Sequence, residues 1–229
     1  MKAEGAAQLH RGPLTVAVML ATLMQVLDMT IANVALPHMQ GSFAVSLDQI
    51  KWVLTSYIVA SAVATPLMGW LAERYGRRNV LLAAIGAFVV FSFMVGSSVA
   101  ISEIVIARIL QGVAGAAFSP LAQAILLDAY PRERHGTAMA ILGVGILVGP
   151  ILGPIVGGFL TQYYSWRWCF FINVPLGALA LLLVWNFVPR RLVRRKLSFD
   201  WLGFVMLGLG IGALQFMLDR GSTKNWFSS

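Results

Sequence analysis

Several long stretches of this chain contain no charged residue, among them residues 80–100 and 168–189. A helix rises ~1.5 Å per residue, so each stretch reaches ~30 Å, the thickness of the hydrocarbon core of a bilayer. Charged residues make up only 11% of the chain, against about 25% in soluble domains. The sequence therefore predicts an integral membrane protein.

The apolar runs predict an all-α membrane protein with seven spans. Helices are expected because the runs are continuously apolar rather than alternating. The first run is too long for the core of a signal peptide, so we interpret it as a retained span. The expected spans are residues 14–36, 50–71, 80–100, 104–127, 137–160, 169–188 and 201–218.

The net charge of +8 could indicate nucleic-acid binding, but the distribution of the 17 Lys and Arg residues argues against it. Most of them fall on the side of the predicted spans that carries the N-terminus. The other side has only Lys51, Arg167, Arg220 and Lys224. The positive-inside rule then predicts a cytoplasmic N-terminus, with anionic lipid headgroups as neighbours.

The basic stretch between spans six and seven is the best candidate for a domain boundary. We expect a cytoplasmic N-terminus (1–13), a six-span bundle (14–188), a cytoplasmic basic loop (189–200), a seventh helix (201–218) and an outer segment (219–229). Asp200 is expected to N-cap the seventh helix. The odd number of spans and the abrupt end suggest a truncated protein. The alternative is a small seven-span protein.

The short connection between spans two and three, GWLAERYGRRNVL at residues 69–81, concentrates charge. Gly69 would let another helix approach closely, and Gly76 would permit a tight turn. A positive-inside hairpin explains the arginines, but not the acid or the glycine spacing. The stretch resembles the G-x-L-A-D-R-x-G-R-R-x-x-L loop of the major facilitator superfamily, with Glu73 in place of the usual Asp. The resemblance implies a cytoplasmic charge network that helps to hold one gating state. Its residues would be Gly69, Glu73, Arg74, Gly76, Arg77, Arg78 and Asp128.

The stretch RILQGVAGAA, residues 108–117, places Arg108, Gln111, Gly112 and Gly115 on one helix face. An arginine within a span should face the bundle or water. The alternative is that its side chain extends to the outer headgroups. We favour the first interpretation because Gln111 shares the face. The pattern resembles the R-x-x-Q-G motif in the fourth helix of the same superfamily.

One carboxylate, Asp28, interrupts the apolar stretch MQVLDMTIANVALP at residues 24–37. Counting helical rises places Asp28 ~12 Å from the outer end of span one, and Arg108 within ~10 Å of the outer end of span four. The two charges should therefore lie at similar depths. Burial favours a neutral carboxyl group, whereas a nearby guanidinium favours a charged one. Such a carboxylate could load and release a proton; the alternative is a fixed structural ion pair.

The segment LDMTIANVALP resembles the first-helix motif of drug:proton antiporters of the EmrB/QacA type. This resemblance implies a proton and substrate site that consists of Asp28, Asn33, Arg108 and Gln111.

The fifth span carries the sequence GILVGPILGPIVGG at residues 145–158. Glycines at every fourth position form a bare ridge for close helix contact, and two prolines each remove a backbone donor. A generic packing face would explain the glycines alone. Together the residues resemble the G-x-x-x-G-P-x-x-G motif of exporters in the superfamily, which favours export. They are Gly145, Gly149, Pro150, Gly153, Pro154 and Gly157.

The sixth span begins with WRWCFFINVPLG, residues 166–177, whose aromatic residues suit a membrane interface. Asn173 and Pro175 are expected to break this helix, and they resemble another EmrB/QacA-type motif. The resemblance therefore extends from about residue 13 to the end of the chain. It implies two six-helix halves of 3+3 inverted repeats in a fourteen-span protein. This chain would hold the N-terminal half and one linker helix.

The resemblance implies proton-driven multidrug efflux by alternating access across the bacterial inner membrane. Substrates would be hydrophobic or cationic drugs, no cofactor is expected, and partners could be a periplasmic adaptor and an outer-membrane channel. The alternatives are export of an endogenous metabolite and a non-transporting half-transporter remnant. An enzyme is not expected, because the sequence has no GxxxxGK(S/T) loop, HExxH motif or paired intramembrane aspartates. Cys169 and three scattered histidines give no metal-ligand pattern.

Overall fold

The computed structural model describes residues 11–190 and 198–221, and all regular elements in these ranges are helical. The helices are α1 (Arg11–Phe43), α2 (Leu47–Tyr75), α3 (Arg77–Ser97), α4 (Ile101–Gly115), α5 (Phe118–Ala129), α6 (His135–Tyr163), α7 (Trp168–Phe171), α8 (Asn173–Phe187) and α9 (Trp201–Gly221). Six stretches of the described chain are long and apolar enough to cross a membrane, and α9 adds a shorter apolar helix, Trp201–Gln215. The predicted all-α membrane fold is confirmed.

Two of the predicted spans are interrupted rather than continuous. The fourth span is divided into α4 and α5 at Ala116 and Ala117. Pro120 has no N–H to donate to the carbonyl of Ala116, four residues earlier, which accounts for the position of the break. The fourth span, predicted over 104–127, lies within the apolar stretch Ile101–Ala129 and is confirmed, although its helix has this break. The sixth span is divided at Ile172, next to Asn173 as expected.

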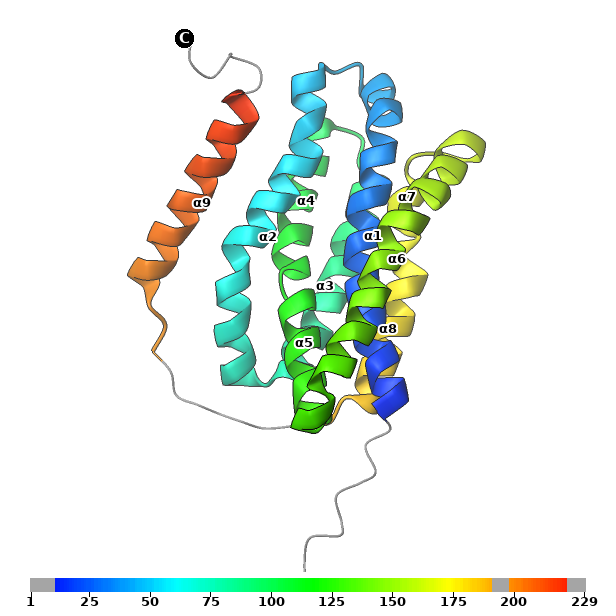
Figure 1. Ribbon diagram of the computed structural model, residues 1–229. Helices are drawn as coiled ribbons and strands as arrows, with labels where there is room; N and C mark the ends of the chain where they lie inside the picture. The colour runs from blue at the N-terminus through cyan, green and yellow to red at the C-terminus, as the bar shows by residue number, and fades with distance from the viewer. Residues whose placement is uncertain (1–10, 191–197, 222–229) are drawn as a thin grey trace, which may run out of the picture.

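The six membrane-spanning stretches alternate in direction and pack around α1, which lies alongside α6, α8 and α5 (Figure 1). On the other side of the bundle α2 pairs with α4, while α3 packs on α4 and α8. Helix α9 stands beside α2 at the edge of the bundle (Figure 1). The buried apolar residues form two clusters, one on each side of the middle of α1. Asp28 lies between them.

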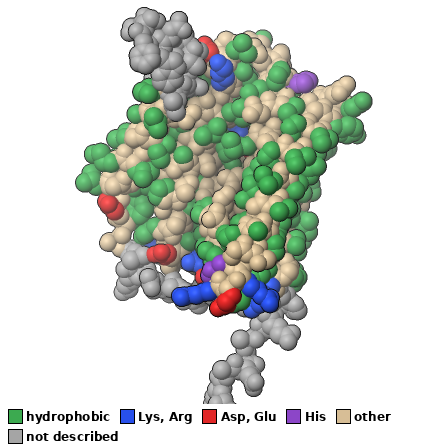
Figure 2. Space-filling view, in the orientation of Figure 1, with side chains coloured by type: hydrophobic (Ala, Val, Ile, Leu, Met, Phe, Trp, Pro, Cys, Tyr) green, Lys and Arg blue, Asp and Glu red, His purple; other side chains and the backbone are tan. Residues whose placement is uncertain are grey.

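The charged side chains gather at one end of the bundle, which we call the basic end (Figure 2). The start of α1, the turn between α2 and α3, the connection between α5 and α6 and the end of α8 all lie there (Figure 1). Its described basic residues are Arg11, Arg74, Arg77, Arg78, Arg132, Arg134 and Arg190. The opposite end carries Lys51 and Arg167. The charge asymmetry predicted from the sequence is thus present in the folded chain.

The start of α9 confirms one local prediction, because the Gly203 backbone N–H donates to Asp200 Oδ1 over 2.8 Å. Asp200 therefore caps this helix. The expectations for residues 1–10, for the middle of the basic loop (191–197) and for residues 222–229 fall outside the described residues.

Candidate functional site

A cluster of polar side chains is buried in the middle of the bundle, where α1, α4 and α8 meet. Asp28 comes from α1, Arg108 and Gln111 from successive turns of α4, and Asn173 from the first turn of α8. None of the four side chains is more than 1% exposed. Arg108 pairs with Asp28 through Nη1 and Oδ2. The predicted meeting of the two charges at one depth is therefore confirmed.

The guanidinium of Arg108 has partners on three sides. Its Nε donates to the Val53 carbonyl of α2 over 3.1 Å, and its Nη1 donates to Gln111 Oε1 over 2.9 Å. The ring of Tyr57 lies against it, with 4.3 Å between the guanidinium carbon and the ring centroid. A buried cation is tolerated when it is paired and hydrogen-bonded. These contacts hold Arg108 in a fixed orientation toward Asp28.

Gly112 allows α2 and α4 to approach closely at this site. A Cβ atom at residue 112 would overlap the backbone carbonyl of Tyr57. The absence of a side chain therefore brings the Tyr57 ring over Arg108, four residues earlier on α4.

The carboxylate of Asp28 accepts hydrogen bonds at both oxygens. Oδ2 faces Arg108, while Oδ1 accepts from Gln111 Nε2 over 3.0 Å and from Asn173 Nδ2 over 2.7 Å. Asn173 Nδ2 also donates to Ser92 Oγ over 2.9 Å, and Ser92 Oγ donates to the Phe170 carbonyl over 2.9 Å. All of these neighbours donate to Asp28, which suits a charged carboxylate, because such a group only accepts hydrogen bonds.

Asn173 and Ser92 were not predicted as site residues. The sequence interpretation assigned Asn173 to the helix break and to a family motif, and Ser92 lies in an otherwise apolar run. Their signal was their polarity inside predicted spans, since buried polar groups need partners.

Asn33 does not join this cluster, and its part in proton or substrate binding stays a prediction. Its side chain is exposed, whereas Asp28 is buried. Five residues along a helix correspond to a rotation of ~140° relative to the starting residue. Asn33 therefore points to a different side of α1.

The predicted charge network at the basic end is formed in part. Gly76 has φ 89°, a conformation that glycine adopts readily, and it joins α2 to α3 in one residue. Arg77 pairs with Asp128 and donates to the Ala124 carbonyl over 3.0 Å, so it ties α3 to α5. Arg78 instead donates to the Trp185 carbonyl of α8 over 2.6 Å.

Three other residues of the network behave differently from the expectation. Glu73 is exposed, and the Arg74 guanidinium lies over the ring of Trp70, 5.2 Å from its centroid. Gly69 is exposed, and a Cβ built there would meet no atom of the described chain within 4 Å. The close helix contact expected at Gly69 is therefore not made within the described residues.

The glycine ridge of α6 packs directly on α1. A Cβ atom at Gly145, Gly149 or Gly153 would collide with Met19, Val26 or Thr30 of α1, respectively. A Cβ atom at Gly157 would be tightly packed against Val34 and Ile31. Thr30 Oγ1 lies 3.4 Å from the Gly149 carbonyl across the contact, while its shorter hydrogen bonds are with carbonyls of its own helix. Pro150 and Pro154 are exposed, because each lies about 100° around α6 from the ridge glycine before it. The ridge residues Gly145, Gly149, Gly153 and Gly157 thus bring α6 against the turns of α1 that flank Asp28.

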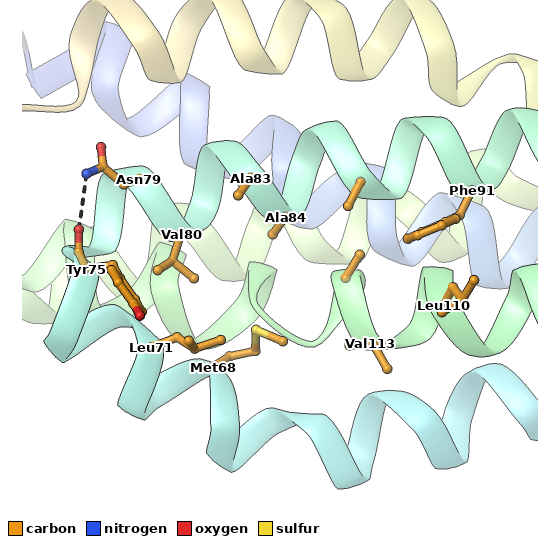
Figure 3. A pocket seen from close by; sticks show the side chains of 12 residues that line it. Met68, Leu71, Tyr75, Asn79, Val80, Ala83, Ala84, Phe91, Leu110 and Val113 are labelled. Carbon is orange, nitrogen blue, oxygen red and sulfur yellow. Dashed lines mark hydrogen bonds between the residues drawn. The ribbon is translucent and has the colours of Figure 1, made fainter. Parts of the chain in front are cut away.

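Two open apolar grooves lie on the surface of the bundle. One is formed by α2, α3 and α4, with a volume of about 490 Å³, and Tyr75 and Asn79 mark its end near the basic residues (Figure 3). The other lies between α2, α4 and α9 and has a volume of about 580 Å³. Among the described residues, no group of His, Cys, Asp and Glu side chains could hold a metal ion.

Comparisons with known proteins give a matching family model and several similar proteins. The family model described as Major Facilitator Superfamily matches residues 18–218. The multidrug export protein EmrB of Haemophilus influenzae is 43% identical over 219 residues, which are 94% of this chain and 42% of that protein. The fatty acid resistance protein FarB of Neisseria gonorrhoeae is 39% identical over 94% of this chain and 43% of its own length. The chain thus spans less than half the length of these curated relatives.

A solved structure shares the fold. The partially occluded, inward-open xylose transporter XylE of E. coli superposes with a TM-score of 0.73 at 18% sequence identity. The match covers 94% of this chain and 61% of that protein. At this identity the likeness concerns the fold alone.

Proposed function

We propose that this chain, which belongs to the Major Facilitator Superfamily, forms part of a proton-coupled exporter of hydrophobic or cationic drugs that works by alternating access. Membership of the superfamily makes it a transporter rather than an enzyme. The observation that carries the proposal is the fully buried ion pair of Asp28 and Arg108. Ionisable residues inside a membrane are costly and mark ion or substrate pathways.

The geometry suggests how a proton would act. When Asp28 is charged, Arg108 and two amides are bound to it. A proton on Asp28 removes the charge that Arg108 faces and leaves a buried cation without its partner. The bundle then gains free energy by rearranging around Arg108, and this rearrangement would displace the substrate. Proton and substrate would thereby occupy the site in turn, as export driven by a proton gradient requires.

The basic end supplies a second element of this mechanism. We propose that it faces the cytoplasm, because positive charge is retained there. The Arg77–Asp128 pair joins α3 to α5 at this end. It would stabilise the state in which these two helices lie together, and it would break when the cytoplasmic side rearranges.

The cargo is proposed from the relatives. The EmrB proteins are named for multidrug export and FarB for fatty acid resistance. Apolar drugs are therefore our first candidate, and a fatty acid or another endogenous amphiphile is the second. Both suit the shortage of polar groups in the two grooves. Because export in Gram-negative bacteria crosses two membranes, an adaptor and an outer-membrane channel are possible partners.

Replacing Asp28 with asparagine in the complete transporter should abolish proton-driven drug transport. The measurement is accumulation of a cationic dye in everted vesicles that carry an imposed pH gradient. Substrate exchange without a gradient should continue, because it needs no proton movement, and this exchange shows that the variant is folded. Asp48→Asn is the matched control, since the Asp48 side chain is 79% exposed at the surface. Gradient-driven transport at the wild-type rate in Asp28→Asn contradicts the proposal.

A further inference from the structure

The amide of Asn173 is held in one orientation by its neighbours. Its nitrogen faces two acceptors, Asp28 Oδ1 at 2.7 Å and Ser92 Oγ at 2.9 Å. The Ser92 hydroxyl already uses its hydrogen to donate to the Phe170 carbonyl, so its oxygen can only accept from Asn173. Both hydrogens of the amide nitrogen are therefore used.

The oxygen of the same amide, Asn173 Oδ1, makes no hydrogen bond to the described residues. Asn173 is 0% exposed, so this oxygen is buried. A buried acceptor without a partner costs free energy, and such groups in folded proteins call for an explanation.

A protonated Asp28 would need a hydrogen-bond acceptor, and Asn173 Oδ1 is an acceptor without a partner among the described residues. The neutral carboxyl group has an O–H that must donate, but its present neighbours Arg108, Gln111 and Asn173 all donate to it. Gln111 cannot reverse its amide freely, because its oxygen accepts from Arg108 Nη1. Asn173 can, because its oxygen is unused and the two ends of the amide have nearly the same shape.

We propose that Asn173 is a positioning residue whose amide responds to the protonation of Asp28. It presents nitrogen to the charged carboxylate and rotates to present oxygen to the neutral carboxyl group. This inference rests on the proposed role of Asp28 as the proton site. Rotation also takes the N–H away from Ser92 and so removes a bond between α8 and α3 at the break in the sixth span. Protonation of Asp28 on α1 would thereby break a hydrogen bond between α8 and α3.

Other titratable groups lie near the pair. Within the described chain, those facing Asp28 are Arg108 from α4, Tyr57 from α2 and Cys169 from α7. Ser92 from α3 and the glycine ridge of α6 add no titratable group. The response can therefore be followed by replacing Asn173, which changes no charge.

The test is the pH dependence of substrate binding to the complete transporter carrying Asn173→Leu. Proton and substrate compete, so binding weakens as the pH falls. Both forms of Asp28 lose a hydrogen bond to Asn173 in this variant. Because the bond to the charged form is the stronger of the two, the midpoint should move to higher pH by about one unit. Asn186→Leu is the matched control, because Asn186 is exposed on the same helix and bonds only to the Leu182 carbonyl of its own helix. Its midpoint should not change.

A second variant and a second measurement keep the proposal testable if Asn173→Leu does not fold. Ser92→Ala removes one acceptor that favours the nitrogen-facing amide, so it should shift the midpoint in the same direction by a smaller amount. Infrared difference spectra of protein with isotopically labelled asparagine should show an amide band that changes with pH. This band should be absent in Asn173→Leu and in Asp28→Asn.

The outcomes separate the two proposals. If substrate binding stays pH-dependent in Asp28→Asn, the proton site itself is wrong. If Asp28→Asn removes the pH dependence while Asn173→Leu and Ser92→Ala keep the wild-type midpoint, only the role of Asn173 is overturned. A shift of the midpoint to lower pH in Asn173→Leu also overturns it.

Discussion

Replacing Arg108 with leucine in the complete transporter is expected to lower the free energy of unfolding by about 3–5 kcal/mol. Arg108 and Asp28 are both buried, at 0% and 1% exposure. Removing the guanidinium leaves an uncompensated carboxylate in a region of low dielectric, and it also leaves the Val53 carbonyl without this donor. The measurement is thermal or denaturant unfolding of the purified protein in detergent.

A double variant separates the charge effect from lost packing. Asp28→Asn combined with Arg108→Leu contains no unpaired charge at this site. It should therefore be more stable than Arg108→Leu alone, even though it carries one more substitution. Such non-additivity is expected for two residues in direct contact. If the two single effects simply add, the pair does not interact as the geometry indicates.

Replacing Gly112 with alanine should destabilise the bundle by about 1–3 kcal/mol or more, through overpacking. The new Cβ would meet the Tyr57 carbonyl, which is a backbone atom of α2 and cannot rotate away. The α2–α4 contact would have to open, and the Tyr57 ring would move off Arg108. The loss should appear as a lower unfolding temperature and as weaker substrate binding.

The matched control for this substitution is Gly143→Ala in α6. A Cβ at residue 143 would meet no described atom within 4 Å. Alanine is favoured over glycine inside a helix by about 1 kcal/mol, so this variant should be as stable as the wild type or slightly more stable. Equal destabilisation by both substitutions would mean that close packing at Gly112 is unimportant.

The sequence predicted the spans and the central ion pair because both depend on local regularities. Apolar length determines a span, and counting rises along two antiparallel helices was enough to place Asp28 and Arg108 at one depth. Gln111 followed from its helical spacing to Arg108. The glycine ridge was also predicted from regular helical spacing, although the sequence did not indicate that it packs on α1.

The rest depends on contacts between helices that are distant in the sequence. Asn173 reaches Asp28 only because α8 packs against α1, and no pattern within the sixth span reveals that neighbour. The break between α4 and α5 had a local signal in Pro120. Asn33 entered the predicted site through the resemblance of its segment to the first-helix motif, and helical rotation places it on another face of α1 than Asp28.

The central claim is that Asp28 exchanges a proton for substrate, and proton release on substrate binding tests it most directly. Drug is added to the purified complete transporter in weakly buffered detergent solution, at a pH where the site is partly protonated, and the pH change is recorded. The wild-type protein should release protons in proportion to the drug bound. Asp28→Asn should bind drug and release none, while Asp48→Asn should behave like the wild type. Undiminished proton release from Asp28→Asn would show that the coupling carboxylate lies elsewhere.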